Sequence, residues 1–154
     1  MPMPLATYTN GAVEQMATNA VILYNKHFKH TDQPGHGDFI TTSSDWRSPQ
    51  NTNLWQGVNG VNNPCPNGYR LPTEAELSWI SSTPAGAIAS ALKLPNAGYR
   101  KRQDASLQDV GSRGNYWSSD VSSSNSRQLM FGASSAFLGG NERGNASSVR
   151  CIKD

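Results

Sequence analysis

Apolar residues recur with different spacings along the chain, and each spacing predicts a different kind of element. Between Gly11 and Tyr24 they fall near helical spacing, although the run AVILY in this stretch equally suits a strand. From Phe39 onward Ser, Thr and Asn are frequent, which predicts a short strand followed by a turn-rich loop. Trp46 and Trp55 in this loop are expected to fill the core.

The clearest local signal is a capping box, a helix-start pattern in which two residues satisfy each other's backbone amides. The Thr73 hydroxyl can accept a hydrogen bond from the Glu76 amide, while the Glu76 side chain reaches back. The pattern predicts a helix that begins at Thr73, turns Leu77 toward a sheet and ends within residues 81–84. Small residues at 85–94 predict a second short helix.

Short aromatic groups between polar stretches predict strands in the C-terminal third. The expected strands are 98–100, 116–119, 129–131 and 148–152, in one twisted and mostly antiparallel sheet. Residues 101–104 and 139–142 follow neither the helical nor the strand period, so we expect exposed loops there. The predicted fold class is α+β, with short antiparallel strands, one or two helices and long irregular loops.

The length of 154 residues fits one domain, expected at 39–154, preceded by an appendage at 1–38 for oligomerisation or attachment. Only 36% of the residues are hydrophobic, which favours a loop-rich fold over a helical bundle. A net charge of +2 with scattered basic residues gives no footprint for nucleic acid. The longest apolar run, 20–24, is too short to span a bilayer. The N-terminus lacks a secretion-signal pattern, so any export signal or anchor is expected outside this chain.

Cysteines and histidines offer little material for a metal site. Cys65 and Cys151 are too few for structural zinc, which needs four ligands. His27, His30 and His36 fall in a polar stretch and are expected in a solvated loop, so we expect neither a metal nor another cofactor. If the two cysteines meet, a disulfide would favour an oxidising destination; otherwise they are two buried thiols.

Five sequence blocks carry a resemblance to a known family. They are DWRSPQNTNLWQGVNG, NPCPNGYRLPTEAEL, LPNAGYR, GNYWSS and SSVRCIKD. In this order they resemble the Fibrobacter succinogenes major paralogous domain, a branch of the C-type-lectin-like and formylglycine-generating-enzyme-like folds, over Phe39 to Asp154. The part from Gly98 to Asp154 is similar to the variable regions of proteins diversified by diversity-generating retroelements, such as phage receptor-binding tail proteins and bacterial surface adhesins.

The resemblance implies a C-type-lectin-like ligand-display module on a phage tail or fibre or on a bacterial cell surface. Its partner would be a cell-surface protein or glycan, with no nucleic acid, no membrane insertion and possible homo-oligomerisation. The frame implied by the family consists of Tyr99, Tyr116, Trp117, Val149 and Arg150. Cys65 and Cys151 lie in frame motifs that bracket the domain, so we expect them to be adjacent and able to form a disulfide.

Between the frame residues the resemblance implies variable positions. These lie among Lys101 to Asp104, Gln108, Asp109, Arg113, Asn115, Asp120, Ser124 to Gln128, Met130, Ser134 to Asn141, Arg143 and Asn145. The ligand-binding set is predicted to be Arg102, Asp104, Arg113, Asn115, Asp120, Arg127, Phe137, Leu138, Asn141 and Arg143. Exposed positions tolerate substitution best. We therefore expect this set to be mostly exposed and gathered on one side of the sheet, above buried Tyr99, Trp117 and Val149.

The residue types at these positions leave the question of diversification open. Retroelements mutate template adenines, chiefly in Asn codons that end in a pyrimidine. Such codons can reach Arg102, Asp104, Arg113, Asp120, Phe137 and Leu138, but not Lys101, Gln103, Gln128, Met130 or Glu142. Either the template holds other adenine-containing codons, or the protein is an undiversified paralogue.

Other functions fit the residues less well. Calcium-dependent sugar binding needs an EPN- or QPD-like set and a WND motif, whereas Trp117 is followed by two serines. No nucleophile and base fall at persuasive positions, so we expect no enzyme activity; turn and capping roles explain Asp45, Glu74 and Glu76. Tyr99, Tyr116 and Trp117 could form a sugar-stacking platform, but core positions are favoured. The alternative function is an undiversified structural or assembly module of a phage particle or cell surface.

Overall fold

The computed structural model describes residues 39–78, 87 and 92–154. The N-terminal appendage, with its expected helix or strand and its three histidines, lies outside the described residues. The expected end of the first helix and most of the expected second helix also lie outside them.

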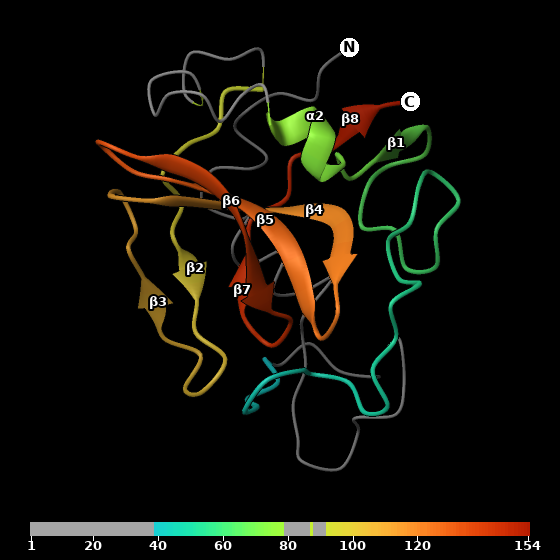
Figure 1. Ribbon diagram of the computed structural model, residues 1–154, viewed down its shortest axis with the longest axis horizontal. Coiled ribbons are helices and arrows are strands. Elements are labelled where there is room, and N and C mark those ends of the chain that lie inside the picture. The colour runs from blue at the N-terminus through green and yellow to red at the C-terminus, as the bar shows by residue number, and fades with distance from the viewer. Residues whose placement is uncertain (1–38, 79–86, 88–91) are drawn as a thin grey trace.

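The described chain is a small α+β domain of mostly antiparallel strands with one short helix (Figure 1). The central sheet has the order β4-β5-β6, with β4 at Gly114–Ser122, β5 at Asn125–Phe131 and β6 at Ala136–Glu142. A second sheet has the order β3-β2-β7, with β2 at Tyr99–Arg100, β3 at Leu107–Gln108 and β7 at Ala146–Ser147. The third sheet pairs β1, Tyr69–Arg70, with β8, Ile152–Lys153. The expectation of a single sheet is therefore wrong.

The two faces of the central sheet are set by its register. On one face the pairs Tyr116–Leu129 and Leu129–Leu138 form a row, because directly paired residues project to the same side. This row packs with Leu77 of helix α2, Glu74–Ser78, which lies above the sheet in Figure 1. Glycine at residue 114 allows this packing, since a Cβ there would overlap the Phe131 ring unless the ring moved.

The opposite face of the sheet belongs to a second cluster. Trp117 is 1% exposed and packs there with Ile40, Trp46 and Val149. Trp55 is partly buried against the same cluster, so both loop tryptophans contact the core as expected. The strand expected near Phe39 is reduced to a single bridge at that residue.

Strand β6 was not predicted. We expect an exposed loop at its second half, 139–142, because these residues follow neither the helical nor the strand period, and two glycines and two polar residues also have low strand propensity. Pairing with β5 overrides that propensity: Gly139 lies opposite Gln128 and Gly140 opposite Arg127. The strand expected at 148–152 is also wrong, since β7 ends at Ser147 and β8 begins at Ile152.

The capping box predicted before α2 is confirmed. The Glu76 amide donates to the Thr73 hydroxyl at 3.2 Å, and the Thr73 amide donates to the Glu76 carboxylate at 2.8 Å. The same carboxylate binds both terminal nitrogens of Arg70 at 2.8 Å. Hydrogen bonds from Arg70 are the main cause that lowers the pKa of Glu76 to about 2.

Cys65 and Cys151 form a disulfide with their Cα atoms 5.8 Å apart, as the expected adjacency requires. The bond joins the loop before β1 to the segment before β8, 86 residues later. In the chain-entropy account, closing a loop of this size stabilises the fold by about 4 to 5 kcal/mol.

Candidate binding pocket

An open pocket of about 290 Å³ lies between the central sheet and the loops around β2 and β3. It is lined by Tyr99, Lys101, Arg102, Gln103, Asp109, Arg113, Asn115, Gln128, Met130, Gly140, Asn141, Glu142 and Asn145. All of these except Tyr99 and Glu142 are variable positions implied by the resemblance. We call this site the amide pocket, because five Asn and Gln side chains line it.

The floor of the amide pocket consists of three buried amides. Asn115, Gln128 and Asn145 are only 5%, 1% and 4% exposed. Asn115 of β4 pairs with Met130 of β5, and the next same-face pair is Trp117 with Gln128. The alternation of side chains along each strand therefore turns the two floor amides of the sheet to the Trp117 face.

Glycine in β6 leaves room above this floor. Gly139 lies opposite Gln128 and contributes no side chain to the face. A Cβ at residue 139 would lie 2.8 Å from the Met130 Cε, the end of a flexible side chain. A larger residue at 139 would therefore displace Met130, which lines the pocket.

The floor amides are only partly satisfied by the protein. The Ser147 hydroxyl donates to Gln128 Oε1 at 2.9 Å, and Gln128 Nε2 has no partner among the described residues. Asn115 Nδ2 is buried and likewise has no hydrogen-bond partner in the described part of the chain. Asn145 is better satisfied: its Nδ2 donates to Asn141 Oδ1 at 2.8 Å, and its Oδ1 accepts from the Arg102 amide at 3.0 Å. Buried donors without partners are uncommon in folded proteins.

Arg102 forms a wall of the pocket and is held by several partners. Its guanidinium lies 2.5 Å from the Glu142 carboxylate and donates from Nε to the Ser43 carbonyl at 2.7 Å. The Gln103 side-chain amide is oriented with its oxygen toward Arg102, and this oxygen accepts hydrogen bonds from both terminal nitrogens of Arg102 at 3.1 Å. Arg102 therefore supports the pocket, although we expected it to be an exposed contact residue.

The rim carries the charges that remain accessible. The Arg113 side chain is 66% exposed and lies 3.9 Å from Asp109, a loose surface pair. Lys101 is half-buried and forms no ion pair within the described residues. Tyr99, expected to be buried in the frame, is half-buried on β2 and lines the pocket.

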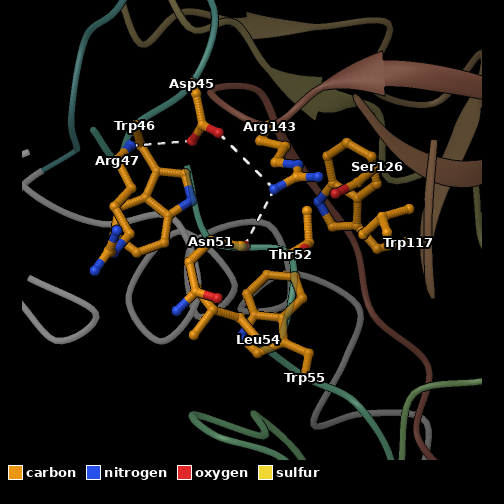
Figure 2. A pocket seen from close by; sticks show the side chains of 11 residues that line it. Asp45, Trp46, Arg47, Asn51, Thr52, Leu54, Trp55, Trp117, Ser126 and Arg143 are labelled. Atoms are coloured by element: carbon orange, nitrogen blue, oxygen red, sulfur yellow. Dashed lines mark hydrogen bonds and ion pairs between the residues drawn. The ribbon is translucent and has the colours of Figure 1, made fainter. Parts of the chain in front are cut away.

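A second cavity, of about 40 Å³, is lined by Trp117, Trp46 and Arg143 (Figure 2). Arg143 projects into it, 7% exposed, and donates to the carbonyls of Asn51 at 3.1 Å and Ser123 at 3.2 Å. Burial lowers the pKa of Arg143, although Asp45 lies 4.0 Å away. The prediction that Arg143 is an exposed contact residue is wrong, because its guanidinium ties two loops together.

Three further members of the predicted ligand-binding set lie on the α2 side of the central sheet. Leu138 packs against the cluster around Leu77. Asp120 accepts a hydrogen bond from the Glu74 amide at the start of α2. Arg127 forms a double hydrogen bond with the Glu74 carboxylate and lowers its pKa. The prediction that the whole set gathers on one side of the sheet is therefore wrong.

The remaining members divide between the pocket and the open surface. Arg102, Arg113, Asn115 and Asn141 line the amide pocket, but Asn115 is buried rather than exposed. Asp104 is exposed outside the lining, and Phe137 is 51% exposed in the same cross-strand row as Asn115 and Met130.

The implied frame is otherwise buried as expected. Tyr116, Trp117, Val149 and Arg150 are 3%, 1%, 2% and 7% exposed. The Tyr116 hydroxyl donates to the Pro95 carbonyl at 2.8 Å, and burial raises its pKa. Tyr116 and Trp117 are thus unavailable as a sugar-stacking platform. Asp45 accepts from the Arg47 amide in the expected turn, whereas Glu74 pairs with Arg127 and does not cap.

Two residues line the pocket although the sequence does not predict them there. The resemblance implies that Tyr99 is a frame residue, and the pattern around Glu142 predicts a loop. No family model, no curated protein and no solved structure matches this chain. Within the described residues no helix could span a membrane, and no cluster of His, Cys, Asp and Glu could hold a metal ion.

Proposed function

We propose that this chain is a ligand-display module that binds a surface protein or glycan through the amide pocket. One observation carries the proposal: nearly every residue that lines the pocket occupies an implied variable position. The pocket also combines a buried donor, Asn115 Nδ2, that has no partner among the described residues, with an exposed cation at its rim, Arg113. Concave sites with a few convergent polar groups are the usual form of ligand sites.

The proposed location is a phage tail or fibre or a bacterial cell surface. The Cys65–Cys151 bond supports it, because disulfides persist mainly in oxidising surroundings. In this proposal the C-type-lectin-like frame holds the pocket rigid while the residues around it differ between versions of the protein. No catalytic step and no cofactor are part of the proposal.

The test is binding of fluorescently labelled protein to a panel of intact bacterial cells and to a glycan array. Arg113→Glu reverses one exposed charge at the rim, and Lys153→Glu reverses an exposed charge in β8. We expect Arg113→Glu to weaken binding about tenfold or more and Lys153→Glu to leave it unchanged. Equal binding by both variants would place recognition outside the pocket.

The alternative is an undiversified structural or assembly module. It is favoured by the dispersal of the predicted ligand-binding set over both faces of the sheet, with Leu138, Asp120 and Arg127 on the α2 side. Exposed apolar residues away from the pocket lining also favour it, chiefly Leu107 at 48% and Val110 at 61%. If the labelled protein binds no cell or glycan, while Leu107→Ser/Val110→Ser changes its oligomeric state, this alternative holds. The neighbouring DNA tests diversification separately: a template repeat that differs only at adenines, beside a reverse transcriptase gene, is expected under the first proposal.

A further inference from the structure

The chemistry of the ligand follows from the pocket groups that the protein leaves unused. Arg102 and Glu142 neutralise each other at 2.5 Å, and Asn145 uses its amide within the wall. The hydrogen-bond donors that remain include the floor amides of Asn115 and Gln128, the amide nitrogen of Asn141, and the cations of Lys101 and Arg113 at the rim. The pocket therefore presents donors and positive charge, which call for oxygen acceptors and negative charge in the ligand.

The charge balance sets how much negative charge the ligand should carry. Three cations, Lys101, Arg102 and Arg113, line the pocket with two carboxylates, Asp109 and Glu142. The lining thus has an excess of one positive charge, and Lys101 is the cation without an ion pair among the described residues. Hydrogen bonds from Ser106 and, to a smaller extent, the charge of Lys101 lower the pKa of Asp104, which lies outside the lining.

We infer that the amide pocket takes a single sugar ring that carries one carboxylate, as part of an acidic glycan. The carboxylate lies at the rim with Lys101 and Arg113, and ring hydroxyls accept hydrogen bonds from Asn115 and Gln128 below. Tyr99 and Met130 supply apolar surface for the ring carbons. The inference rests on the proposed function and narrows its ligand from any surface protein or glycan to one chemical class.

An acidic peptide fits these groups less well. An Asp or Glu residue has acceptors at its carboxylate and at its backbone carbonyls, but the carbonyls belong to a chain that must continue past the pocket, so they are harder to direct at the floor while the carboxylate lies at the rim. A buried donor that stays without a partner in the complex reduces affinity. A ring with hydroxyls around its edge offers acceptors in several directions at once, and the pocket volume of about 290 Å³ is at the small end for ligand sites.

The experiment compares ligands that differ in one group. Methyl glucuronide, which carries the carboxylate, is titrated against methyl glucoside, the neutral ring, and against an N-acetylated, C-amidated Asp residue. Binding is followed by two-dimensional NMR of isotope-labelled protein, including the side-chain amide signals of Asn115 and Gln128. We expect the acid to bind about tenfold tighter than the neutral sugar, to shift both amide signals, and to weaken as salt is raised.

Two substitutions separate the charge contribution from the floor contribution. Lys101→Ala should abolish the preference for the acid, whereas Lys153→Ala, at the exposed β8, should keep it. Asn115→Ala should weaken the binding of both sugars while leaving the melting temperature unchanged or higher, because it removes a buried donor that has no partner among the described residues.

Some outcomes overturn the inference without touching the proposed function. Equal affinity for the acid and the neutral sugar removes the charge argument. Tighter binding of the Asp probe than of either sugar replaces the sugar with a peptide. Absence of binding by all three probes also overturns the ligand class. In each case, loss of cell binding in Arg113→Glu would still support recognition through the pocket.

Discussion

The two faces of the central sheet use similar residues for different purposes. On the α2 face, Arg127 and Asp120 are engaged with Glu74 and the start of the helix. On the pocket face, Arg113 is largely exposed, and Asn115 keeps a donor without a partner among the described residues. A charged or amide residue between frame positions is therefore not a recognition residue by type alone. Its partners decide, and they follow from the face to which the strand turns it.

The largest expected effect is on stability, and it tests whether the pocket face of the sheet also contributes to the hydrophobic core. Trp117→Ala should lower the free energy of unfolding by about 3 to 5 kcal/mol, because a fully buried aromatic side chain is replaced by a cavity. Chemical denaturation measures the change. If the unfolding midpoint stayed the same while ligand binding was lost, Trp117 would be a ligand-contact residue. Its burial would then not distinguish core residues from recognition residues on this face.

A pair of glycine substitutions compares the faces directly. Gly114→Ala should cost about 1 to 3 kcal/mol, because the new Cβ meets the buried Phe131 ring on the α2 face. Gly139→Ala should change stability by less than about 1 kcal/mol, since the Met130 end can move and alanine suits a strand better than glycine. It should nevertheless weaken ligand binding by narrowing the pocket. Equal melting temperatures for Gly114→Ala and Gly139→Ala would contradict the proposed difference in packing between the two faces.

Lowering the pH should reduce stability through the loss of the Glu76 interactions at the start of α2. The folded pKa of Glu76 is about 2, below its ordinary value of 4.5, so its stabilisation is complete above pH 4.5 and is lost as pH falls toward 2. Glu76→Gln should flatten this part of the stability profile, measured by thermal melting from pH 6 to pH 2. A profile as steep as that of the unmodified protein would assign the acid sensitivity to other carboxylates.

Matched arginine substitutions give the smallest and most specific effects. Arg127→Ala should lower the melting temperature without changing ligand binding, because it breaks the pair with Glu74. Arg113→Ala should change stability by no more than about 0.5 kcal/mol and should reduce binding, because its side chain is exposed at the rim. If the two variants exchange these properties, the assignment of the faces is wrong.

Local chemistry predicted some elements well. The Thr73–Glu76 capping box located the helix start, since its hydrogen bonds join residues three positions apart. The aromatic frame positions Tyr116 and Trp117 were correctly expected to be buried. The proximity of Cys65 and Cys151 came from the family resemblance rather than from local pattern, and the structure has the bond.

Long-range pairing limited the rest of the prediction. Strand β6 forms because β5 offers it a partner, which the residues of 139–142 do not reveal. A register shift between Trp117 and Val121 changes the alternation along β4, so the positions of Asp120 and nearby residues could not be deduced by counting. Four members of the predicted ligand-binding set line one pocket, and the others are dispersed. The face to which each residue points depends on the register of strand pairing, which the sequence does not reveal.

Arg102 joins segments that are distant in the sequence. Its carbonyl accepts from the Thr42 amide at 2.8 Å, its Nε binds the Ser43 carbonyl, and its guanidinium holds Glu142 on β6. A substitution here would release several attachments at once and change the shape of the cavity rather than remove one ligand contact. A change at position 102 would therefore alter the pocket through the segments that Arg102 positions, as well as through its own side chain in the lining.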